Sequence, residues 1–154
     1  MMEQTLVIIK PVAVHRGLIG EVITRFERKG LFIIGMKMMQ LDEQILREHY
    51  AHLTSKQFFP DLLKSMMATP VIVMCIEGKD AVEVVRLMTG ATNGRKALPG
   101  TIRGDLSMSG QENVVHASDS IDNAKIELAR FFKPGEILAY KPSDFQFYYA
   151  PDEV

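Results

Sequence analysis

The stretch Pro70-Val71-Ile72-Val73-Met74-Cys75-Ile76-Glu77 is the most hydrophobic strand candidate in this chain of 154 residues. Its six apolar residues follow one another without interruption, which is typical of a strand that is buried on both faces of a sheet. We therefore expect this strand to be central. Its cysteine is the only one in the chain, so we expect a buried thiol and no internal disulfide.

The segments on either side of this strand alternate between strand and helix patterns. Further strands are predicted at 5–9, 31–40 and in the short run that ends at His116. Helical spacing of apolar residues covers 18–29, 43–53, 58–67, 79–88 and 120–132. When the segment 42–67 is taken as an inserted helical hairpin, the order is βαββαβ, which predicts a ferredoxin-like α+β fold. We expect its four-stranded antiparallel sheet to be covered by helices on one face.

The composition limits the class of protein. With 47% hydrophobic and 24% charged residues, and with no linker or repeat, the sequence predicts a single domain over residues 1–154. Its 18 basic and 19 acidic residues nearly cancel, which argues against a broad surface for nucleic acid or an anionic membrane. The N-terminal apolar run is too short for a signal peptide or a membrane span, and we expect a cytoplasmic protein.

The stretch from Asn113 to Ser120, NVVHASDS, is the candidate centre of the chemistry. It brings His116 to the end of a β-branched run, directly before a polar turn that opens a helix. Imidazole is largely unprotonated near neutral pH and is then nucleophilic, so His116 is a candidate for covalent catalysis. The alternative is an ordinary hydrogen-bonded histidine at a strand end.

A carboxylate on the following helix is the candidate partner of this histidine. Ser118, Asp119 and Ser120 provide N-cap chemistry for the helix, and Glu127 lies at the edge of its apolar face. A carboxylate that binds one ring nitrogen would leave the other nitrogen free to attack. The alternative is a surface glutamate. Elsewhere, His49 and His52 are three residues apart, but no nearby carboxylate or thiol completes a zinc site.

Candidate anion ligands are spread over several elements. The segment from about 90 to 112 has no clear periodicity and combines glycines with cationic and hydroxyl side chains, as suits either an anion site or a solvated loop. Walker A and Gly-x-Gly-x-x-Gly sequences are absent, so nucleotide phosphates would have to be bound by side chains and metal. The candidates for that role are Lys10, Arg86, Thr92, Arg103 and Asn113.

Several motifs resemble the nucleoside diphosphate kinase family over nearly the whole chain. They are Lys10-Pro11, the run 16–21 (RGLIGE), His49-Tyr50, the run 99–105 (PGTIRGD) and the run 113–120 (NVVHASDS). The resemblance implies a ferredoxin-like core with a helical-hairpin lid at about 42–67. It also implies a ping-pong reaction in which His116 takes the γ-phosphate of a nucleoside triphosphate and passes it to a nucleoside diphosphate. Magnesium bound mainly through the phosphates and a tetrameric or hexameric homo-oligomer are further implications.

The resemblance also assigns site residues. It places phosphate and sugar contacts on Lys10, Tyr50, Arg86, Thr92, Arg103 and Asn113, and base stacking on Phe58. Glu127 and Ser118 match residues that orient the histidine or support transfer, and Tyr50 counts among the catalytic positions as well. The chain departs from the family pattern at Val12-Ala13, Ala91, Gly94 and Gly110. We expect these departures to change loop stiffness and to loosen the base clamp. The alternative function is a nucleotide- or nucleic-acid-binding regulator on the same fold, without turnover.

Overall fold

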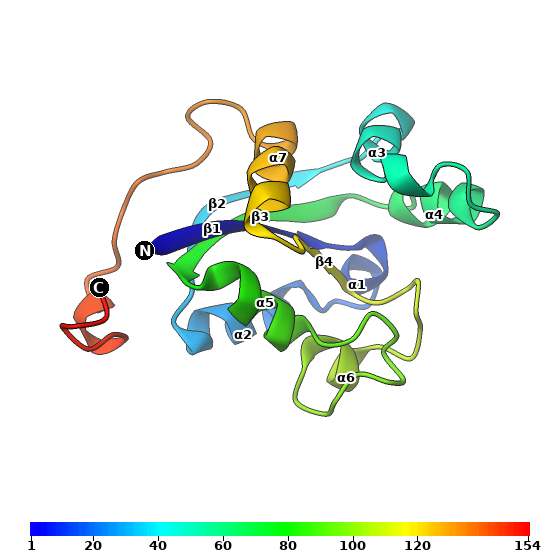
Figure 1. Ribbon diagram of the computed structural model, residues 1–154. Coiled ribbons are helices and arrows are strands. Elements are labelled where there is room, and N and C mark those ends of the chain that lie inside the picture. Colours follow the sequence, from blue (N-terminus) through cyan, green and yellow to red (C-terminus); the bar gives the residue numbers. More distant parts are fainter.

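The computed structural model describes residues 1–154 of the protein. A four-stranded antiparallel sheet forms its centre (Figure 1). Its strands are β1 (Met2–Ile9), β2 (Phe32–Met39), β3 (Val71–Lys79) and β4 (Val115–Ala117), in the order β2-β3-β1-β4. β3 pairs with β1 from Ile72 opposite Ile9 to Lys79 opposite Met2. The hydrophobic run 71–76 is completely buried, as predicted, and the α+β fold class is confirmed.

Helices cover both faces of the sheet, so the expectation that one face is covered was wrong. On one face, α2 (Ile19–Lys29) and α5 (Ala81–Thr89) pack on the odd-numbered residues of β1. On the other, α7 (Ile121–Phe131), α3 (Glu43–His49) and α4 (Phe59–Met66) pack on the even-numbered ones. Consecutive strand side chains point to opposite faces, so a strand in which Leu6 to Ile9 are all apolar needs cover on both.

The helix ends follow local sequence rules. Gly30 ends α2 in the left-handed conformation, with a φ of 91°, which glycine adopts without strain. Ser120 caps α7 by accepting a hydrogen bond from the backbone N–H of Asn123. Ile121, the first residue of this helix, is 47% exposed. Two short helices, α1 (Pro11–His15) and α6 (Ile102–Leu106), were not predicted because five residues carry no recognisable period.

The segment between β2 and β3 contains α3, a single 3₁₀ turn at Ala51–Leu53 and α4, which lie together at one end of the sheet (Figure 1). Asp42 caps α3 through its carboxylate, which accepts from the N–H of Ile45. At the opposite end, the C-terminal segment after α7 runs back past β2 to a 3₁₀ turn at Phe145–Phe147. No helix of the protein has the length and apolar character needed to cross a membrane.

Candidate functional site

The backbone immediately before β4 is strained. Val114 has a φ of 73°, and the N–H of Val115 donates to the carbonyl of Asn113 at 2.9 Å, which closes a γ-turn around a β-branched residue. Val114 is completely buried, and Lys10 N–H donates to its carbonyl, so neighbouring contacts hold the turn. Strained backbone of this kind is typical of functional sites. The turn brings His116 into the middle of β4, opposite Ile8 of β1.

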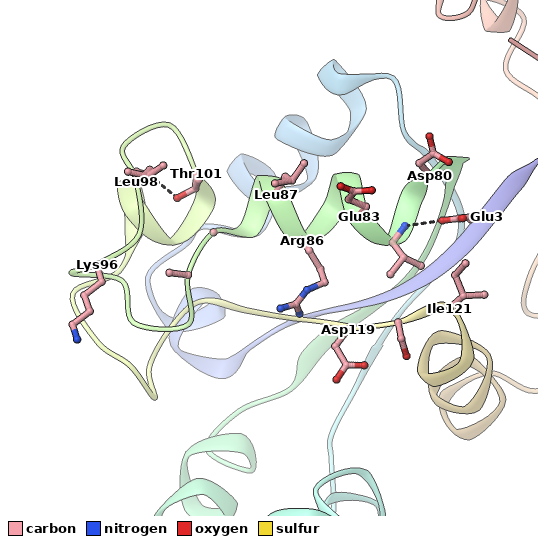
Figure 2. Close-up of a pocket in the computed structure, with 14 residues that line it drawn as sticks. Glu3, Asp80, Glu83, Arg86, Leu87, Lys96, Leu98, Thr101, Asp119 and Ile121 are labelled. Carbon is pink, nitrogen blue, oxygen red and sulfur yellow. Dashed lines mark hydrogen bonds between the residues drawn. The ribbon is translucent and has the colours of Figure 1, made fainter.

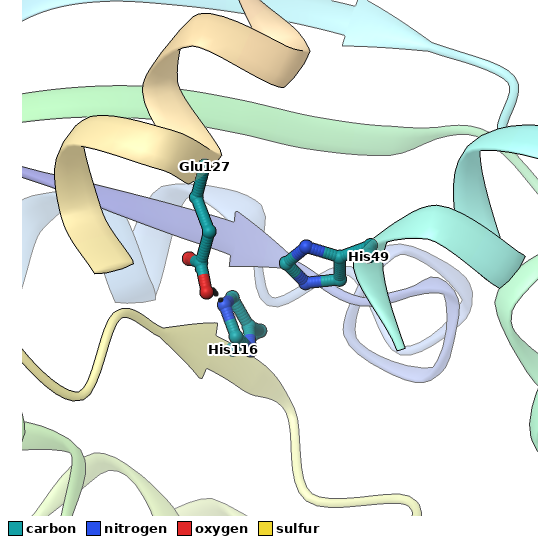
Figure 3. A group of neighbouring side chains, drawn as sticks. All are labelled: His49, His116 and Glu127. Atoms are coloured by element: carbon teal, nitrogen blue, oxygen red, sulfur yellow. Dashed lines mark hydrogen bonds and ion pairs between the residues drawn. The ribbon is translucent and has the colours of Figure 1, made fainter. Parts of the chain in front are cut away.

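His116 contacts the carboxylate that the sequence had proposed as its partner. Its Nε2 lies 2.9 Å from Oε2 of Glu127, on α7 (Figure 3). The hydroxyl of Ser118 donates to the same oxygen at 2.7 Å. Burial alone would raise the pKa of Glu127, but the hydrogen bonds and charge of its neighbours hold it below the ordinary value. An ionised carboxylate only accepts, so the proton lies on Nε2, and Nδ1 of His116 keeps a free electron pair.

A cleft of about 870 Å³ opens over this histidine. Nine of the ten predicted site residues line it, and Ser118 lies behind it, where it contacts Glu127. The nine are spread along the chain from position 10 to position 127: Lys10, Tyr50, Phe58, Arg86, Thr92, Arg103, Asn113, His116 and Glu127. Phe58 is 45% exposed, whereas the adjacent Phe59 is only 2% exposed and belongs to the core. The structure therefore separates the two aromatic residues, which sequence composition could not.

Lys10 is buried in this cleft, whereas a lysine at a strand end is usually solvated. Its Nζ donates to Oδ1 of Asn113 at 2.7 Å. Burial, followed by the charge of Arg103, lowers the pKa of Lys10 to about 8. Asn113 is itself held by two further hydrogen bonds, which its Nδ2 donates to the carbonyls of Thr92 and Gly110. The lysine therefore has a fixed position instead of a mobile one.

Arg103, from α6, is bound to three backbone carbonyls on two segments of the chain. Its guanidinium donates to the carbonyls of Asn113, Gly90 and Val115. These bonds join the long loop to the strand that bears His116. Burial, with the charge of Arg86, lowers the pKa of Arg103 to about 10. The guanidinium has five N–H groups, so two remain for a ligand.

Sequence reasoning missed His49 and Arg130 as members of the site. His49, at the end of α3, is 6% exposed, and its ring centre lies 4.5 Å from that of His116. Arg130, on α7, approaches Nδ1 of His49 at 3.0 Å. His52, the residue with which His49 had been paired as a zinc candidate, is exposed and is not part of this group. No local signal marks a contact between residues 81 positions apart.

A second hollow of about 770 Å³ lies on the other side of Arg86 (Figure 2). Arg86 extends from α5 between this hollow and the first cleft, and its side chain has no hydrogen bond within the protein (Figure 2). Four carboxylates line the second hollow, those of Glu3, Asp80, Glu83 and Asp119. It contains none of the other predicted residues, so we assign the nucleophile and the anion ligands to the cleft over His116.

The positions that depart from the family pattern differ in the space around them. A Cβ atom on Gly94 would lie 2.2 Å from the carbonyl oxygen of Ser107, so the loop closes there only with glycine. Gly110 lines the cleft, and a Cβ atom on it would meet nothing closer than 3.8 Å. Ala13 is completely buried in α1. The loosened base clamp stays a prediction.

Comparison with known proteins identifies the family. The family model for nucleoside diphosphate kinase matches residues 3–137. A nucleoside diphosphate kinase from Parabacteroides distasonis is 60% identical over 152 residues, which cover 99% of this chain and 99% of the relative. One from Pyrococcus horikoshii is 52% identical over 149 residues, 95% of each. The structure of a halophilic nucleoside diphosphate kinase from Halobacterium salinarum in complex with CDP matches with a TM-score of 0.94 and 40% identity, and covers 97% of this chain and 100% of that one. The chain belongs to the nucleoside diphosphate kinase family.

Proposed function

We propose that this enzyme moves the γ-phosphate of a nucleoside triphosphate, typically ATP, to a nucleoside diphosphate by way of His116. The observation that carries the proposal is the hydrogen bonding of the His116 imidazole. Its Nε2 is bound to the ionised carboxylate of Glu127, while Nδ1 keeps its electron pair within a cleft that contains the cations Lys10, Arg86 and Arg103. A fixed nucleophile among cations suits phosphoryl transfer, which depends mainly on positioning and charge stabilisation.

The reaction has two half-reactions that are mirror images. Nδ1 of His116 attacks the γ-phosphorus in line, the bond from phosphorus to the β,γ-bridging oxygen breaks, and the nucleoside diphosphate leaves with that electron pair. Glu127 stabilises the positive charge that develops on the ring, and Ser118 holds the carboxylate in place. A second nucleoside diphosphate then enters, and an oxygen of its β-phosphate attacks the phosphorus to regenerate His116.

The proposed roles of the ligands follow from their free donors. The ammonium of Lys10, two N–H groups of Arg103, the unpaired Arg86 and the hydroxyls of Thr92 and Tyr50 are available to phosphate and sugar oxygens. Both amide protons of Asn113 are already donated to carbonyls, so we assign Asn113 mainly to holding Lys10. The exposed ring of Phe58 is placed to stack on a base, with the weak base selectivity that stacking brings. The relative from Halobacterium salinarum is described in complex with CDP, which agrees with a nucleotide cleft.

The cleft fits a magnesium ion that arrives with the nucleotide. Mg²⁺ is usually bound by one or two carboxylates together with substrate phosphates and waters. The cleft is lined by only three carboxylates, and Glu127 already accepts from His116 and Ser118. Asp119 accepts from Asn123, and Glu48 lies near Arg130, so we propose that the ion is bound mainly through the nucleotide phosphates, with no dedicated protein ligand. Bound there, the ion would neutralise charge on the phosphate oxygens.

Self-association and location complete the proposal. The edge strand β2 exposes Met36 and Met38, with 55% and 60% of their surface accessible, which supports a homo-oligomer of tetrameric or hexameric type. We further propose a single domain over 1–154 in which residues 42–67 close over the nucleotide as a lid and residues 90–112 form the substrate and subunit loop. A cytoplasmic location and no requirement for nucleic acid belong to the same proposal.

Labelling with γ-labelled ATP tests the carrier. The protein should acquire an acid-labile, base-stable label that His116→Ala abolishes, and the label should pass to an added nucleoside diphosphate. In the same assay, Glu127→Gln should slow labelling with little change in nucleotide affinity. Labelling that survives His116→Ala would rule out the carrier. Nucleotide binding with exchange no faster than background would favour the alternative, a binding regulator without turnover.

A further inference from the structure

His49 lies against His116, the proposed phosphate carrier, and has no role in the proposed mechanism. Its ring is enclosed by those of Tyr50, Phe131 and His116, with centre-to-centre distances of 4.6, 5.1 and 4.5 Å. All three pairs are close to perpendicular, which is an edge-to-face arrangement. Figure 3 shows the ring on α3 pointing towards His116 and Glu127 across the cleft.

Arg130 fixes the position of the proton on His49. A guanidinium has only donors, and its NH1 lies 3.0 Å from Nδ1 of His49, so Nδ1 must accept. The proton of the neutral ring is then on Nε2. Burial, together with the charge of His116, lowers the pKa of His49 to about 3, so the ring stays neutral at physiological pH. Nε2 is buried and has no hydrogen-bond partner. His49 therefore presents a neutral, unpaired N–H beside His116.

A metal ion is the obvious alternative reading of this group. One ligand atom each from His49, His116 and Glu127 lie within 4.8 Å of one another, and two histidines with a glutamate are a common zinc set. A metal needs a free electron pair on each histidine. His116 has such a pair on Nδ1, but in the neutral ring of His49 the only pair accepts from Arg130. The tautomers therefore favour a hydrogen-bond donor over a metal ligand.

We propose that the Nε2–H of His49 donates a hydrogen bond to an oxygen of the phosphoryl group while His116 carries it. This inference rests on the proposed function. A buried N–H without an acceptor is unfavourable and is rarely kept without a use. The two ring centres are 4.5 Å apart, so a phosphoryl group on His116 would bring strong acceptor oxygens close to the ring of His49. His49 is then a catalytic residue, and Arg130, which sets its tautomer, is a positioning residue.

A neutral donor suits a group that must be taken up and released equally well. A further cation next to the phosphohistidine would stabilise this intermediate strongly and slow its second half-reaction, because only stabilisation of the transition state accelerates both directions. A neutral N–H aligns the oxygens with a smaller effect on the ground state. Since His49 does not titrate near neutral pH, the contribution should be constant there.

Two substitutions separate hydrogen bonding from packing. His49→Phe keeps an aromatic ring against Tyr50 and Phe131 but has no donor, whereas His49→Gln loses the ring and keeps an N–H at about the reach of Nε2. Rapid-quench measurement of His116 labelling by ATP, and of its discharge to ADP, gives both rate constants for the full-length protein. We expect His49→Phe to slow both about 10- to 100-fold, as for one hydrogen bond to a charged group. Glutamine should recover most of the loss, and ADP affinity should change less than about twofold.

The rates of the two variants distinguish a hydrogen-bonding role of His49 from a structural one. A purely structural role predicts the reverse order, with phenylalanine faster than glutamine, and either this order or a wild-type rate in His49→Phe would overturn the inference. Wild-type protein and His116→Ala run in parallel: if labelling does not depend on His116, the proposed function fails first and the inference with it. A measurement without turnover is the ¹⁵N NMR tautomer of His49. Protonated Nε2 with unprotonated Nδ1 supports the inference, and the opposite tautomer contradicts it.

Discussion

Lys10 illustrates how burial shapes the individual residues of this cleft. It is 9% exposed, and no carboxylate bonds to it; its hydrogen-bond partners are an amide oxygen and a backbone carbonyl. A charge in such a place is poorly solvated, so its charged form is disfavoured until an anion arrives. Phosphate oxygens that bind next to the ammonium stabilise its charged form, and this stabilisation contributes to the binding free energy of the nucleotide. Its low pKa is therefore linked to nucleotide affinity.

Nucleotide affinity should fall as the pH rises through about 8. The pKa of Lys10 is lowered to about 8, so the ammonium is present below this pH and is lost above it. Above pH 8, binding must also take up a proton, and the Kd for ADP should rise by up to about tenfold per pH unit. Isothermal titration calorimetry from about pH 6.5 to about pH 9.5 would measure the change.

The matched variant is Lys10→Gln, which has no titrating group at this position. It should bind ADP more weakly at neutral pH, and its Kd should show no bend near pH 8. A wild-type Kd that stays constant across pH 8 would show that Lys10 does not bind the phosphates as an ammonium.

At the level of residues, the sequence predicted the side chains that line the cleft better than the contacts that hold these side chains in place. His116, Glu127 and the cations stood out by residue type and by the motif around them, and the structure brings them together. The contact between His49 and Arg130 was missed, because it depends on how α3 packs against α7. The burial of Lys10 was equally invisible, since the sequence around a strand end does not show what covers it.

The start of α4 shows how one element divides its residues between core and site. Phe58 is the N-cap residue and Phe59 the first helical residue, and neighbouring side chains on a helix point about 100° apart. Phe59 consequently packs with Leu46 and Leu62 in the core, while Phe58 lies on the wall of the cleft. Rigid placement of one ring therefore supports the position of the other.

Alanine substitution at these adjacent positions should give opposite phenotypes. Phe59→Ala removes a fully packed ring and should lower the free energy of unfolding by about 3–5 kcal/mol. Phe58→Ala should change it by less than about 0.5 kcal/mol, because nearly half of this ring is exposed, but should weaken nucleotide binding by about 1–3 kcal/mol, as loss of base stacking does. Urea unfolding and ADP titration measure the two effects. Loss of stability in Phe58→Ala, or loss of affinity alone in Phe59→Ala, would contradict this division.

At the level of elements, the long periodic segments were the predictable ones. The patterns at 18–29 and 120–132 became α2 and α7 within two residues, and the continuous run 70–77 became the core of β3. The number of covered faces was mispredicted because the helical pattern at 120–132 and the hairpin at 42–67 both lie outside the βαββαβ order on which the expectation was based. The continuous apolar run from Leu6 to Ile9 in β1 did carry that information, since a strand with one solvated face would alternate.

In the whole molecule, the cleft over His116 and the C-terminal segment lie at opposite ends of the sheet. The cleft lies at the end of the sheet that carries α3 and α4, and the C-terminal segment lies at the other end, next to the N-terminus (Figure 1). Phe145 stacks at 5.4 Å from the ring of Phe32, and the backbone N–H of Lys79 donates to the hydroxyl of Tyr149. The aromatic tail therefore packs on the surface of its own domain.

Removal of residues 141–154 should therefore lower stability without changing the chemical step. The deletion exposes Phe32 and loses the half-buried rings of Phe145 and Tyr149, so we expect a loss of about 2–4 kcal/mol in the free energy of unfolding. For a chain of this size that corresponds to a decrease of roughly 5–15 °C in Tm. The rate of His116 labelling below the transition should stay within about twofold of wild type, because the transition-state contacts are untouched. Phe145→Ala is the matched point substitution and should give a smaller shift of the same sign. A truncated protein that keeps its Tm but loses labelling would show that the tail acts on the site, through this subunit or a neighbouring one.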